Sequence, residues 1–526
     1  MTRCISIILT LCLILAAIPE AHASNVEQSL VVGIQSNKTA RIRPLDPEER
    51  DFLSVYDLMY ESLVVIDDNY MPQPGLAESW EVSPNGRTWT FKLRSGITFH
   101  DGSPLRADDV VATMQYILNR ASDEVSANRG YYRNLKYFVS GVSCTPSTEQ
   151  SPSLTVVVKA ERPYFGLLYA MTFPVLPAAY VEQDNPPGTG AYRIRSFEPG
   201  QSITLQRYTG WWKTAPQVES IYFMCNQNPR DVIEDYEYAR VETIFTRSIA
   251  AAQYRSGTGS LAISSRTNQL EVLLMNHSSS RLADVRVRKA IRMVVDPDSI
   301  AGSVYMGMVT RTDFPFIPGT WTYNDALEST FTQNLSEARK LLEEAGWGDS
   351  NQDGYLDRLN EEDPTQLVEF NLNLYVYEEP DNDVRIEAAN MIQEQLAQVG
   401  IIVNITTMTF TGIQEKLDAG SFNLALVSFA MDPCPDPGFM LMTGNTGNYG
   451  RYRSNQMTDL FKQLRTCTEQ NEYRQKLMEI QQTFAEDCPF ICLYYRNGVI
   501  LTRRMYTVLR DIREGQLLRG IEAFHP

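Results

Sequence analysis

The stretch from 367 to 429 constrains the fold more than any other part of the chain. Three apolar runs alternate there with two segments of helical periodicity, in the order 367–376, 384–399, 401–405, 413–417 and 422–429. This β-α-β-α-β order predicts a parallel or mixed sheet with right-handed crossovers. Ligands of such sheets bind beyond the carboxyl ends of the strands, and Asp432 comes directly after the last one.

An earlier part of the chain has a different pattern. Apolar and polar residues alternate from Trp80 to Val82 and again from Trp89 to Leu93, on either side of the turn sequence Asn85-Gly86. This pattern predicts a β-hairpin with one apolar face. Helical spacing over 108–121 follows, with Leu154 to Val158 as a further strand, so we expect an α+β unit.

The N-terminal segment has the features of an export signal. Arg3 precedes the apolar run Cys4–Ile18, and Ala21-His22-Ala23 forms a small-residue cleavage site. These features predict a secretory signal peptide over residues 1–23. Neither Cys4 nor Cys12 has the preceding small residue that a lipoprotein signal needs, so we expect an exported, soluble protein.

Export would place the remaining six cysteines in an oxidising compartment, as local disulfide staples whose pairing the sequence leaves open. They are Cys144, Cys225, Cys434, Cys467, Cys488 and Cys492. No C-x-x-C pair is present, and His100, His277 and His525 are widely spaced, so no zinc or other metal site is predicted from these residue types.

Composition excludes several classes of function. The chain is 43% hydrophobic, which excludes a disordered protein, and its net charge of −17 makes nucleic acid and anionic lipid poor partners. It contains no G-x-S-x-G, H-E-x-x-H or P-loop motif, so we expect no catalytic residues and no cofactor. An exported hydrolase with two unmarked carboxylates remains an alternative.

Two polar segments could carry function. Asp349 to Asp357 resembles a calcium loop, but Asn360 stands where the bidentate glutamate belongs, which favours a polar turn and leaves calcium open. Asp432-Pro433-Cys434-Pro435-Asp436-Pro437 is stiffened by three prolines. It is either a rigid surface loop or a preorganised carboxylate for an ammonium group.

A longer resemblance covers nearly the whole mature chain. Residues 74–114 read PGLAESWEVSPNGRTWTFKLRSGITFHDGSPLRADDVVATM, and further matches are GTGAYRI from Gly188, GWW from Gly210, DVRVRKAI from Asp284, AGWGDSNQDGYLD from Ala345 and PFICLYYRNG from Pro489. Together they resemble the family 5 solute-binding proteins, which serve bacterial ABC importers of dipeptides, oligopeptides, nickel complexes and related solutes.

The resemblance implies an α/β, two-lobed periplasmic-binding-protein fold of type II (Venus-flytrap), with an extra inserted α+β domain. Domain I is then discontinuous, over 24–60, 186–262 and 490–526. Domain II is the insert at 61–185, and domain III covers 263–489. The ligand would lie between domains I and III, which close by a hinge.

The resemblance also implies site residues. Asp432 matches an aspartate that pairs with the α-ammonium group of a peptide in peptide-binding members. Phe429 takes the place of a tryptophan, Tyr494 and Tyr495 match a cleft-side strand, and Tyr131 and Tyr132 lie where domain II members often offer a tyrosine. Nickel-binding relatives have a histidine near the site; none occurs here between 278 and 524, which disfavours nickel.

The function expected from the resemblance is binding of di- or oligopeptides and delivery to ABC permease subunits at the membrane. The protein would act as a monomer in the periplasm, or at the cell surface or as a secreted protein if the host is Gram-positive, and no bond would be broken. Alternatives are a non-peptide solute (a sugar, a cell-wall fragment or a metal chelate), and a sensory or scaffold protein that has lost transport.

Overall fold

The structure is a computed structural model. It describes residues 29–524 apart from 37, 123–131, 133, 146–151, 257–258, 328–331, 361, 380–382 and 505–511. The predicted signal peptide and Tyr131 lie outside the described residues. Among the helices that are described, none combines the length and the apolar character needed to cross a membrane.

The strands are β1 (Ser29–Gln35), β2 (Val64–Ile66), β3 (Pro72–Pro74), β4 (Ala77–Val82), β5 (Thr88–Leu93), β6 (Val139–Cys144), β7 (Thr155–Ala160), β8 (Tyr192–Glu198), β9 (Ser202–Arg207), β10 (Ser220–Asn226), β11 (Thr243–Thr246), β12 (Leu261–Met275), β13 (Val309–Arg311), β14 (Asp357–Leu359), β15 (Leu367–Glu369), β16 (Asn371–Tyr377), β17 (Ile402–Met408), β18 (Leu424–Ala430) and β19 (Phe490–Thr502). The α-helices are α2 (Leu53–Met59), α3 (Ala107–Ser122), α4 (Leu135–Phe138), α5 (Leu167–Ala170), α6 (Pro229–Glu237), α7 (Val285–Val294), α8 (Pro297–Ser303), α9 (Leu335–Glu344), α10 (Val384–Ala397), α11 (Phe410–Ala419), α12 (Gly438–Leu441), α13 (Asn455–Leu464) and α14 (Gln470–Asp487). Short 3₁₀ turns are η2 (Ala178–Tyr180), η3 (Ile249–Ser256) and η5 (Ile521–Ala523).

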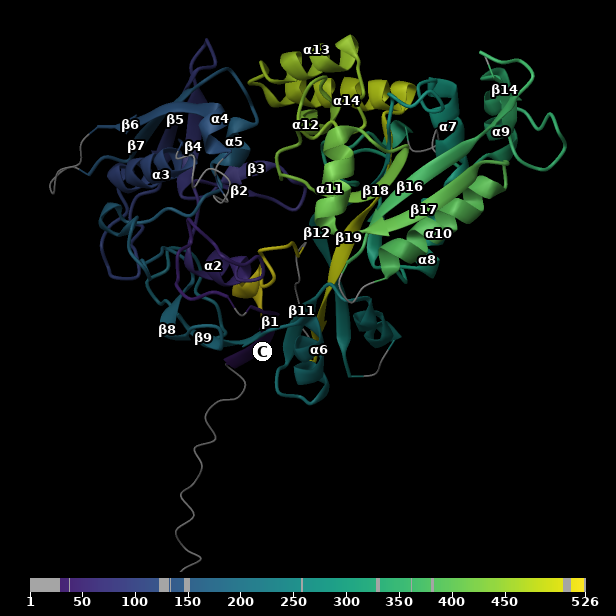
Figure 1. The fold of residues 1–526 in the computed structure, drawn as a ribbon. Coiled ribbons are helices and arrows are strands. Elements are labelled where there is room, and N and C mark those ends of the chain that lie inside the picture. Colours follow the sequence, from purple (N-terminus) through teal and green to yellow (C-terminus); the bar gives the residue numbers. More distant parts are fainter. Residues whose placement is uncertain are drawn as a thin grey trace, which may run out of the picture.

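One large mixed sheet runs through the molecule (Figure 1). Its strand order is β17-β16-β18-β12-β19-β11-β1-β10-β9-β8, with β13 added on β19. β16 pairs in parallel with both β17 and β18, which confirms the parallel pairing predicted from the β-α-β-α-β pattern.

The two long strands β12 and β19 join the halves of this sheet. Residues 261–264 of β12 pair with residues 499–502 of β19, which also pair with β11. Residues 270–274 of β12 pair with residues 490–495 of β19 on one side and with β18 on the other. The register shifts between Arg266 and Leu270, so the ladder is interrupted where the halves meet. A break in two connecting strands is a natural position for a hinge.

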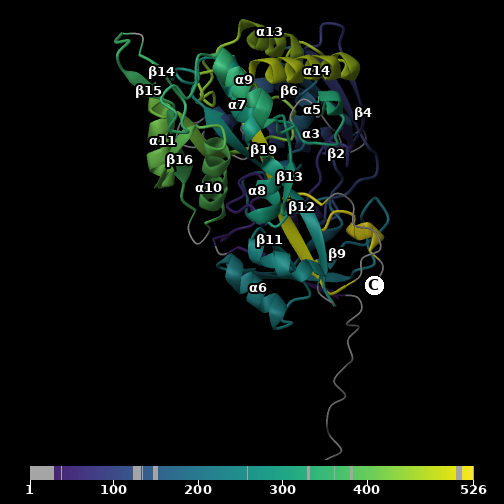
Figure 2. The same ribbon diagram turned by 90° about the vertical axis from the view of Figure 1, so that its right-hand side faces the viewer.

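Helices cover both faces of the half that contains β16. Leu374 and Val376 belong to the hydrophobic core between the sheet and α10. Tyr375 packs against a second hydrophobic core on the opposite face of the sheet, which includes Ile413 and Leu417 of α11. This alternation follows from the period of two along a strand. Figure 2 shows α13 and α14 at the end of the molecule remote from α6.

A separate four-stranded sheet has the order β4-β5-β7-β6, with α3 packed on it. The predicted hairpin is confirmed, with Val82 opposite Trp89 and Trp80 opposite Phe91. Trp89 and Phe91 are buried on its inner face. The predicted domain boundaries stay a prediction, and the one at 262–263 falls inside β12.

The six cysteines are all free thiols in the structure, so the expected disulfide staples are not formed. Cys467, Cys488 and Cys492 are buried in apolar cores and act there as small hydrophobic side chains. Burial raises the pKa of the Cys488 thiol to about 11, which keeps it protonated and unreactive at neutral pH.

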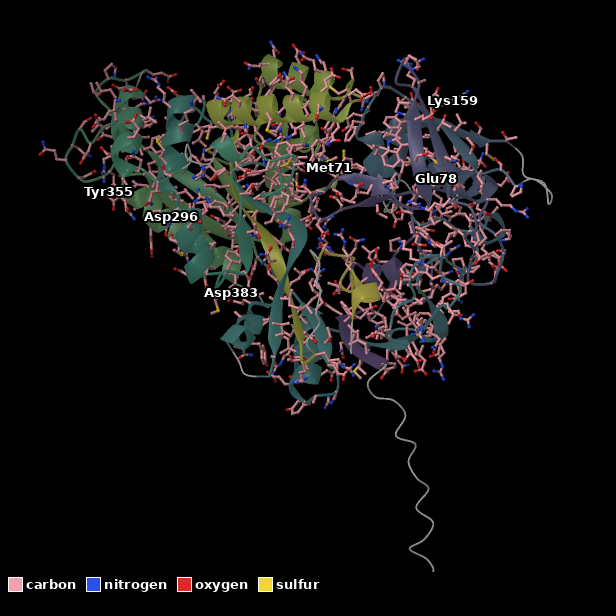
Figure 3. The ribbon with its side chains drawn as sticks, turned by 180° about the vertical axis from the view of Figure 1, so that it is seen from behind. Met71, Glu78, Lys159, Asp296, Tyr355 and Asp383 are labelled. Atoms are coloured by element: carbon pink, nitrogen blue, oxygen red, sulfur yellow. The ribbon has the colours of Figure 1, made fainter. Side chains whose placement is uncertain are left out.

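The Asp349 segment forms a hydrogen-bonded turn at the outer edge of the molecule, next to Tyr355 in Figure 3. The carboxylate oxygens of Asp349 accept hydrogen bonds from the backbone N–H groups of Asp353 and Gly354, each at 3.0 Å. In the described part of the chain, no three His, Cys, Asp or Glu side chains are arranged to hold a metal ion. These bonds support the polar-turn interpretation.

We therefore expect calcium to have no effect on stability. The melting temperature should change by less than about 1 °C between excess calcium chloride and excess chelator, since a bound ion would stabilise the folded state by mass action. Differential scanning calorimetry of the mature protein measures this. A calcium-dependent rise of several degrees that Asp349→Ala abolishes would contradict the turn interpretation.

Candidate functional site

A cavity of about 400 Å³ lies where the two halves of the large sheet meet. Its walls come from α2 and the segment after it, the register break of β12, the turn after β18, and residues 513–522 near the C-terminus. A second cavity of about 30 Å³ adjoins it. Five residues line both cavities: Tyr70, Ile317, Met431, Asp432 and Pro433.

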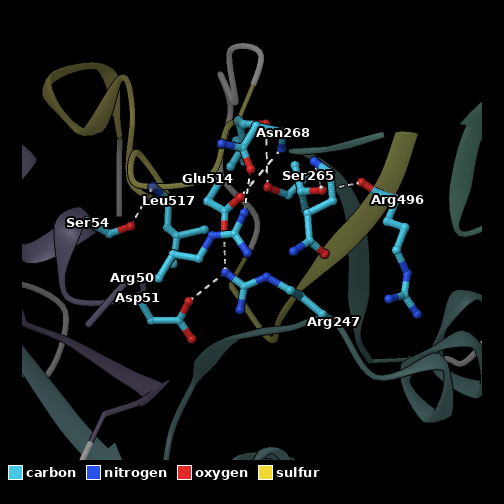
Figure 4. Close-up of polar contacts among 12 residues, drawn as sticks. Arg50, Asp51, Ser54, Arg247, Ser265, Asn268, Arg496, Glu514 and Leu517 are labelled. Carbon is cyan, nitrogen blue, oxygen red and sulfur yellow. Dashed lines mark hydrogen bonds and ion pairs between the residues drawn. The ribbon is translucent and has the colours of Figure 1, made fainter. Parts of the chain in front are cut away.

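An ion network fixes one wall of the larger cavity (Figure 4). Glu514 forms ion pairs with Arg50 and Arg247, and Arg247 also pairs with Asp51 at 2.7 Å. Arg50 donates a further hydrogen bond to the side-chain oxygen of Asn268. The network ties the C-terminal segment to the start of α2 and to the break in β12, which connects three walls of the cavity.

Asp57 of α2 also lies on this wall, and burial disfavours its ionised form. Its carboxylate accepts a hydrogen bond of 2.8 Å from the side-chain nitrogen of Gln516. Burial, only partly offset by this bond, raises the pKa of Asp57 to about 6. An aspartate of an unfolded chain titrates near 4, so ionisation of Asp57 costs the folded state free energy at neutral pH.

Replacing Asp57 by asparagine should therefore stabilise the protein at pH 8, by about 1–2 kcal/mol. Above pH 6 the carboxyl is ionised in both states, and the folded state alone carries the desolvation cost. Below about pH 4 it is protonated in both states, so the gain should vanish. Urea unfolding at the two pH values measures the difference. An equal effect at both would contradict the raised pKa as its cause.

Asp432 lies two residues after β18 and faces both cavities. One carboxylate oxygen accepts the backbone N–H of Cys434 at 2.8 Å, and the other accepts the side-chain amide of Asn134 at 3.1 Å. Asp432 is an exposed residue. Nearby protein still displaces part of its hydration, and this desolvation raises the pKa of its carboxyl. Asp432 has no ion pair with a cation of the described chain.

Asp436, the second acid of the proline-rich segment, has a structural role. It receives two hydrogen bonds from the Arg465 guanidinium, at 2.7 and 2.9 Å, and one of 2.8 Å from the Tyr164 hydroxyl. It lines neither cavity. Of the two acids that the prolines hold in place, Asp432 is therefore the one available to a ligand.

The two predicted site tyrosines of β19 lie on opposite faces of the sheet. Tyr495 is buried and lines the smaller cavity. Tyr494 is 0% exposed and packs on Tyr305, with ring centroids 4.7 Å apart, in the core on the other face of the sheet. Adjacent residues of a strand point to opposite faces, so only one of the pair can reach the cleft. The structure does not place Tyr494 at either cavity.

Of the remaining predicted site residues, some line a cavity and others do not. Tyr132 lines the larger cavity, whereas Tyr131 lies outside the described residues. Phe429 lines neither cavity; it packs on Phe439 and Tyr449 at centroid distances of 6.0 and 6.2 Å. The structure therefore brings together Asp432, Tyr132 and Tyr495 but not Phe429.

Most of the cavity lining was missed by the sequence analysis, including Tyr70, Arg266 and Arg513. The Arg266 and Arg513 guanidinium groups lie 5.7 and 3.8 Å from the centre of the Tyr70 ring. A signal for Arg266 is present in the sequence, since it is a charged residue in the middle of a long strand. Arg513 gives no local signal, because it reaches the site only through the tertiary fold.

The family model described as bacterial extracellular solute-binding proteins, family 5, matches residues 71–451. The chain belongs to this family. The resemblance carried by residues 74–114 and the later motifs is therefore confirmed.

Relatives of the family 5 chain include the oligopeptide-binding protein AppA of Bacillus subtilis, 22% identical over 475 residues, with 84% of this chain and 82% of the relative covered. Heme-binding protein A of Haemophilus influenzae is 20% identical over 452 residues, covering 81% and 79%. Among solved structures, NikA from Brucella suis in complex with Fe(III)-EDTA superposes with a TM-score of 0.76 at 19% identity, covering 94% of this chain and 99% of that one.

These comparisons confirm the mixed α/β fold class over nearly the whole chain. They also identify the protein as the solute-binding component of an ABC transporter, in a family whose members are not enzymes. The ligands named for these relatives differ in chemistry, so family membership determines the kind of function but not the identity of the solute.

Proposed function

We propose that this protein binds short peptides through their free amino end, in the cavity at the junction of the two sheet halves. Asp432 carries the proposal. Its carboxylate is oriented by Cys434 and Asn134, faces the cavity, and has no ion pair with a described cation. A carboxylate that is already positioned binds an ammonium group at a low entropic cost.

The cavity supplies the other requirements of a peptide site. A volume of about 400 Å³ is in the range of a small-ligand pocket. Tyr132 and Tyr495 offer aromatic walls next to Asp432.

Binding would be coupled to closure. A solute that touches both halves of the sheet stabilises the closed arrangement, because only there does it make both sets of contacts. In this proposal the closed protein, a monomer in the periplasm, docks on the permease subunits of an ABC importer and releases the peptide to them.

Native mass spectrometry of the purified mature protein tests the proposal, followed by release and identification of any bound molecule. A series of adducts that resolve to short peptides is the expected result. A single non-peptide mass, for example a tetrapyrrole or a metal chelate like those named for two relatives, would contradict a peptide as the solute. If the protein is isolated bare, calorimetric titration with alanine peptides and these chelates decides between them.

A further inference from the structure

Both cavities are bordered by the same two parts of the molecule. The first is the four-stranded unit, which consists of the sheet β4-β5-β7-β6 and the helices α3, α4 and α5. Tyr169 of α5 lines the smaller cavity, and Tyr132, which precedes α4, lines the larger one. The second is the proline-rich segment 432–437, which contributes Asp432 and Pro433 to both cavities.

Tyr164 joins these two parts. It lies between β7 and α5 and is 1% exposed. Its hydroxyl donates a hydrogen bond of 2.8 Å to the carboxylate of Asp436, which also receives two hydrogen bonds from Arg465. Its ring lies 5.9 Å from the ring of Tyr473 on α14. Figure 1 shows the four-stranded unit beside α12 and α14.

Phe165 makes the adjoining contact through both its backbone and its ring. Its backbone N–H donates to the carbonyl oxygen of Cys467 at 2.7 Å. Its ring lies 5.2 Å from the ring of Tyr473 and 5.9 Å from that of Trp321. We call the contacts of Tyr164 and Phe165 with these residues the gate contact. It is small and formed by side chains and one backbone hydrogen bond.

The gate contact can open without unfolding either side. Among the described strands, none of the four-stranded unit pairs with a strand of the large sheet. If Tyr164 moves away, Asp436 keeps both hydrogen bonds of Arg465, and the freed hydroxyl can bond to water. Separation therefore leaves no buried charge without a partner, which is the costly event in breaking most buried polar contacts.

We propose that the four-stranded unit is a gate over both cavities, and that the gate contact holds it shut until it opens locally to admit or release the solute. Tyr169 follows Phe165 by four residues, so movement of this segment would draw Tyr169 away from the proline-rich segment and open the smaller cavity. This motion is distinct from bending at the register break of β12, because it changes no pairing in the large sheet. It goes beyond the proposed function, since the gate would act on any solute of these cavities.

Amide hydrogen exchange tests the gate without a solute. The backbone N–H of Phe165 can exchange only when its hydrogen bond to Cys467 opens. The internal control is Leu93, whose N–H donates to the carbonyl oxygen of Leu154 at the same distance of 2.7 Å, but within the four-stranded unit. After correction for intrinsic rates, we expect Phe165 to exchange roughly 100-fold faster than Leu93, with a weaker dependence on urea. Mass spectrometry with fragmentation to single residues measures both.

Tyr164→Phe tests what holds the gate shut. It keeps the ring and removes the hydroxyl bonded to Asp436, so exchange of Phe165 should rise roughly 10- to 100-fold and keep its weak dependence on urea. Tyr137→Phe is the matched control, because Tyr137 is an exposed tyrosine on α4 of the same unit, 58% exposed. That variant should exchange like the wild-type protein at Phe165.

Two results would overturn the proposal. If Phe165 exchanges in the wild-type protein at the rate of Leu93 and with the same urea dependence, the contact opens only on unfolding and is no gate. If Phe165 exchanges fast but Tyr164→Phe leaves its rate unchanged, Tyr164 does not hold the gate. The first comparison needs no variant, so it decides the matter even if Tyr164→Phe fails to fold.

Stopped-flow binding of tri-alanine separates this inference from the proposed function. The gate contact uses only groups of the chain, so it stabilises the shut state equally with and without solute. Tyr164→Phe should therefore raise the association and dissociation rates by the same factor and change Kd by less than about threefold. A change in the dissociation rate alone would overturn the gate as the route of entry. If tri-alanine does not bind, the peptide function fails, and the exchange of Phe165 still decides the gate.

Discussion

Asp432→Asn is expected to weaken the binding of a free-amine peptide by about 3–5 kcal/mol, which is a factor of a hundred or more in Kd. The asparagine keeps an oxygen for the backbone N–H of Cys434, so the turn after β18 should hold its shape. It removes the negative charge, and the ammonium group of the ligand would then be enclosed beside a neutral amide. Calorimetric titration of wild type and variant measures the loss.

The peptide itself provides the control for this prediction. N-acetylation should cost the wild-type protein about as much affinity as the substitution does, and it should cost the variant almost nothing. Equal sensitivity of both proteins to acetylation would contradict a direct contact between Asp432 and the amine. Because the pKa of Asp432 is raised, affinity for the peptide should also begin to fall at a higher pH than for an ordinary aspartate as the solution is acidified.

Local sequence patterns were sufficient to predict the strands and helices named below and the position of Asp432 after a strand. The strands and helices between 367 and 430 follow from apolar periodicity, and the hairpin at Asn85-Gly86 follows from turn chemistry. Asp432 could be placed because the end of a strand in a β-α-β unit is defined by the sequence itself.

The rest of the site depends on contacts between distant residues. Arg266 and Arg513 lie 247 positions apart, yet they form an isolated bridge and stack on one ring. No local period reveals such a pair. Tyr494 and Tyr495 show a second reason why the site could not be predicted in full. Adjacent side chains of a strand point to opposite faces of the sheet, but the sequence does not indicate which face borders the cavity.

The proline-rich segment shows why two similar acids take different roles. Asp436 lies beside Arg465, and the ion pair fixes the segment to α13 and its C-terminal end. Asp432 forms no ion pair with a described cation and lines both cavities instead. The prolines make this division possible, because a stiff segment holds the two carboxylates apart.

The second large effect is expected at the buried ion pair of the long strand β12. Glu271 is 0% exposed and receives two hydrogen bonds from Arg385 of α10, one of them at 2.6 Å. Arg385 and Arg496 also pair with Glu379, at 2.9 and 2.7 Å. Burial alone would raise the pKa of Glu271, but the charges of Arg385 and Arg496 hold it below its ordinary value. The pair thus joins β12, β19 and α10 close to the break in the sheet.

Glu271→Gln should lower the free energy of unfolding by about 3–5 kcal/mol. The reason is that the buried Arg385 guanidinium would keep only one of its two carboxylate partners, Glu379. The wild-type advantage should be full at neutral pH and should shrink as the pH falls through the lowered pKa of Glu271, where the wild-type carboxyl is protonated too. Urea unfolding measures the change, with Asp459→Asn as the matched control at the exposed Lys462–Asp459 pair. That control should cost less than about 1 kcal/mol. A loss as small as the control's would show that the buried pair contributes no more than a surface one, and that packing of β12 against β19 alone holds the two halves of the sheet in register.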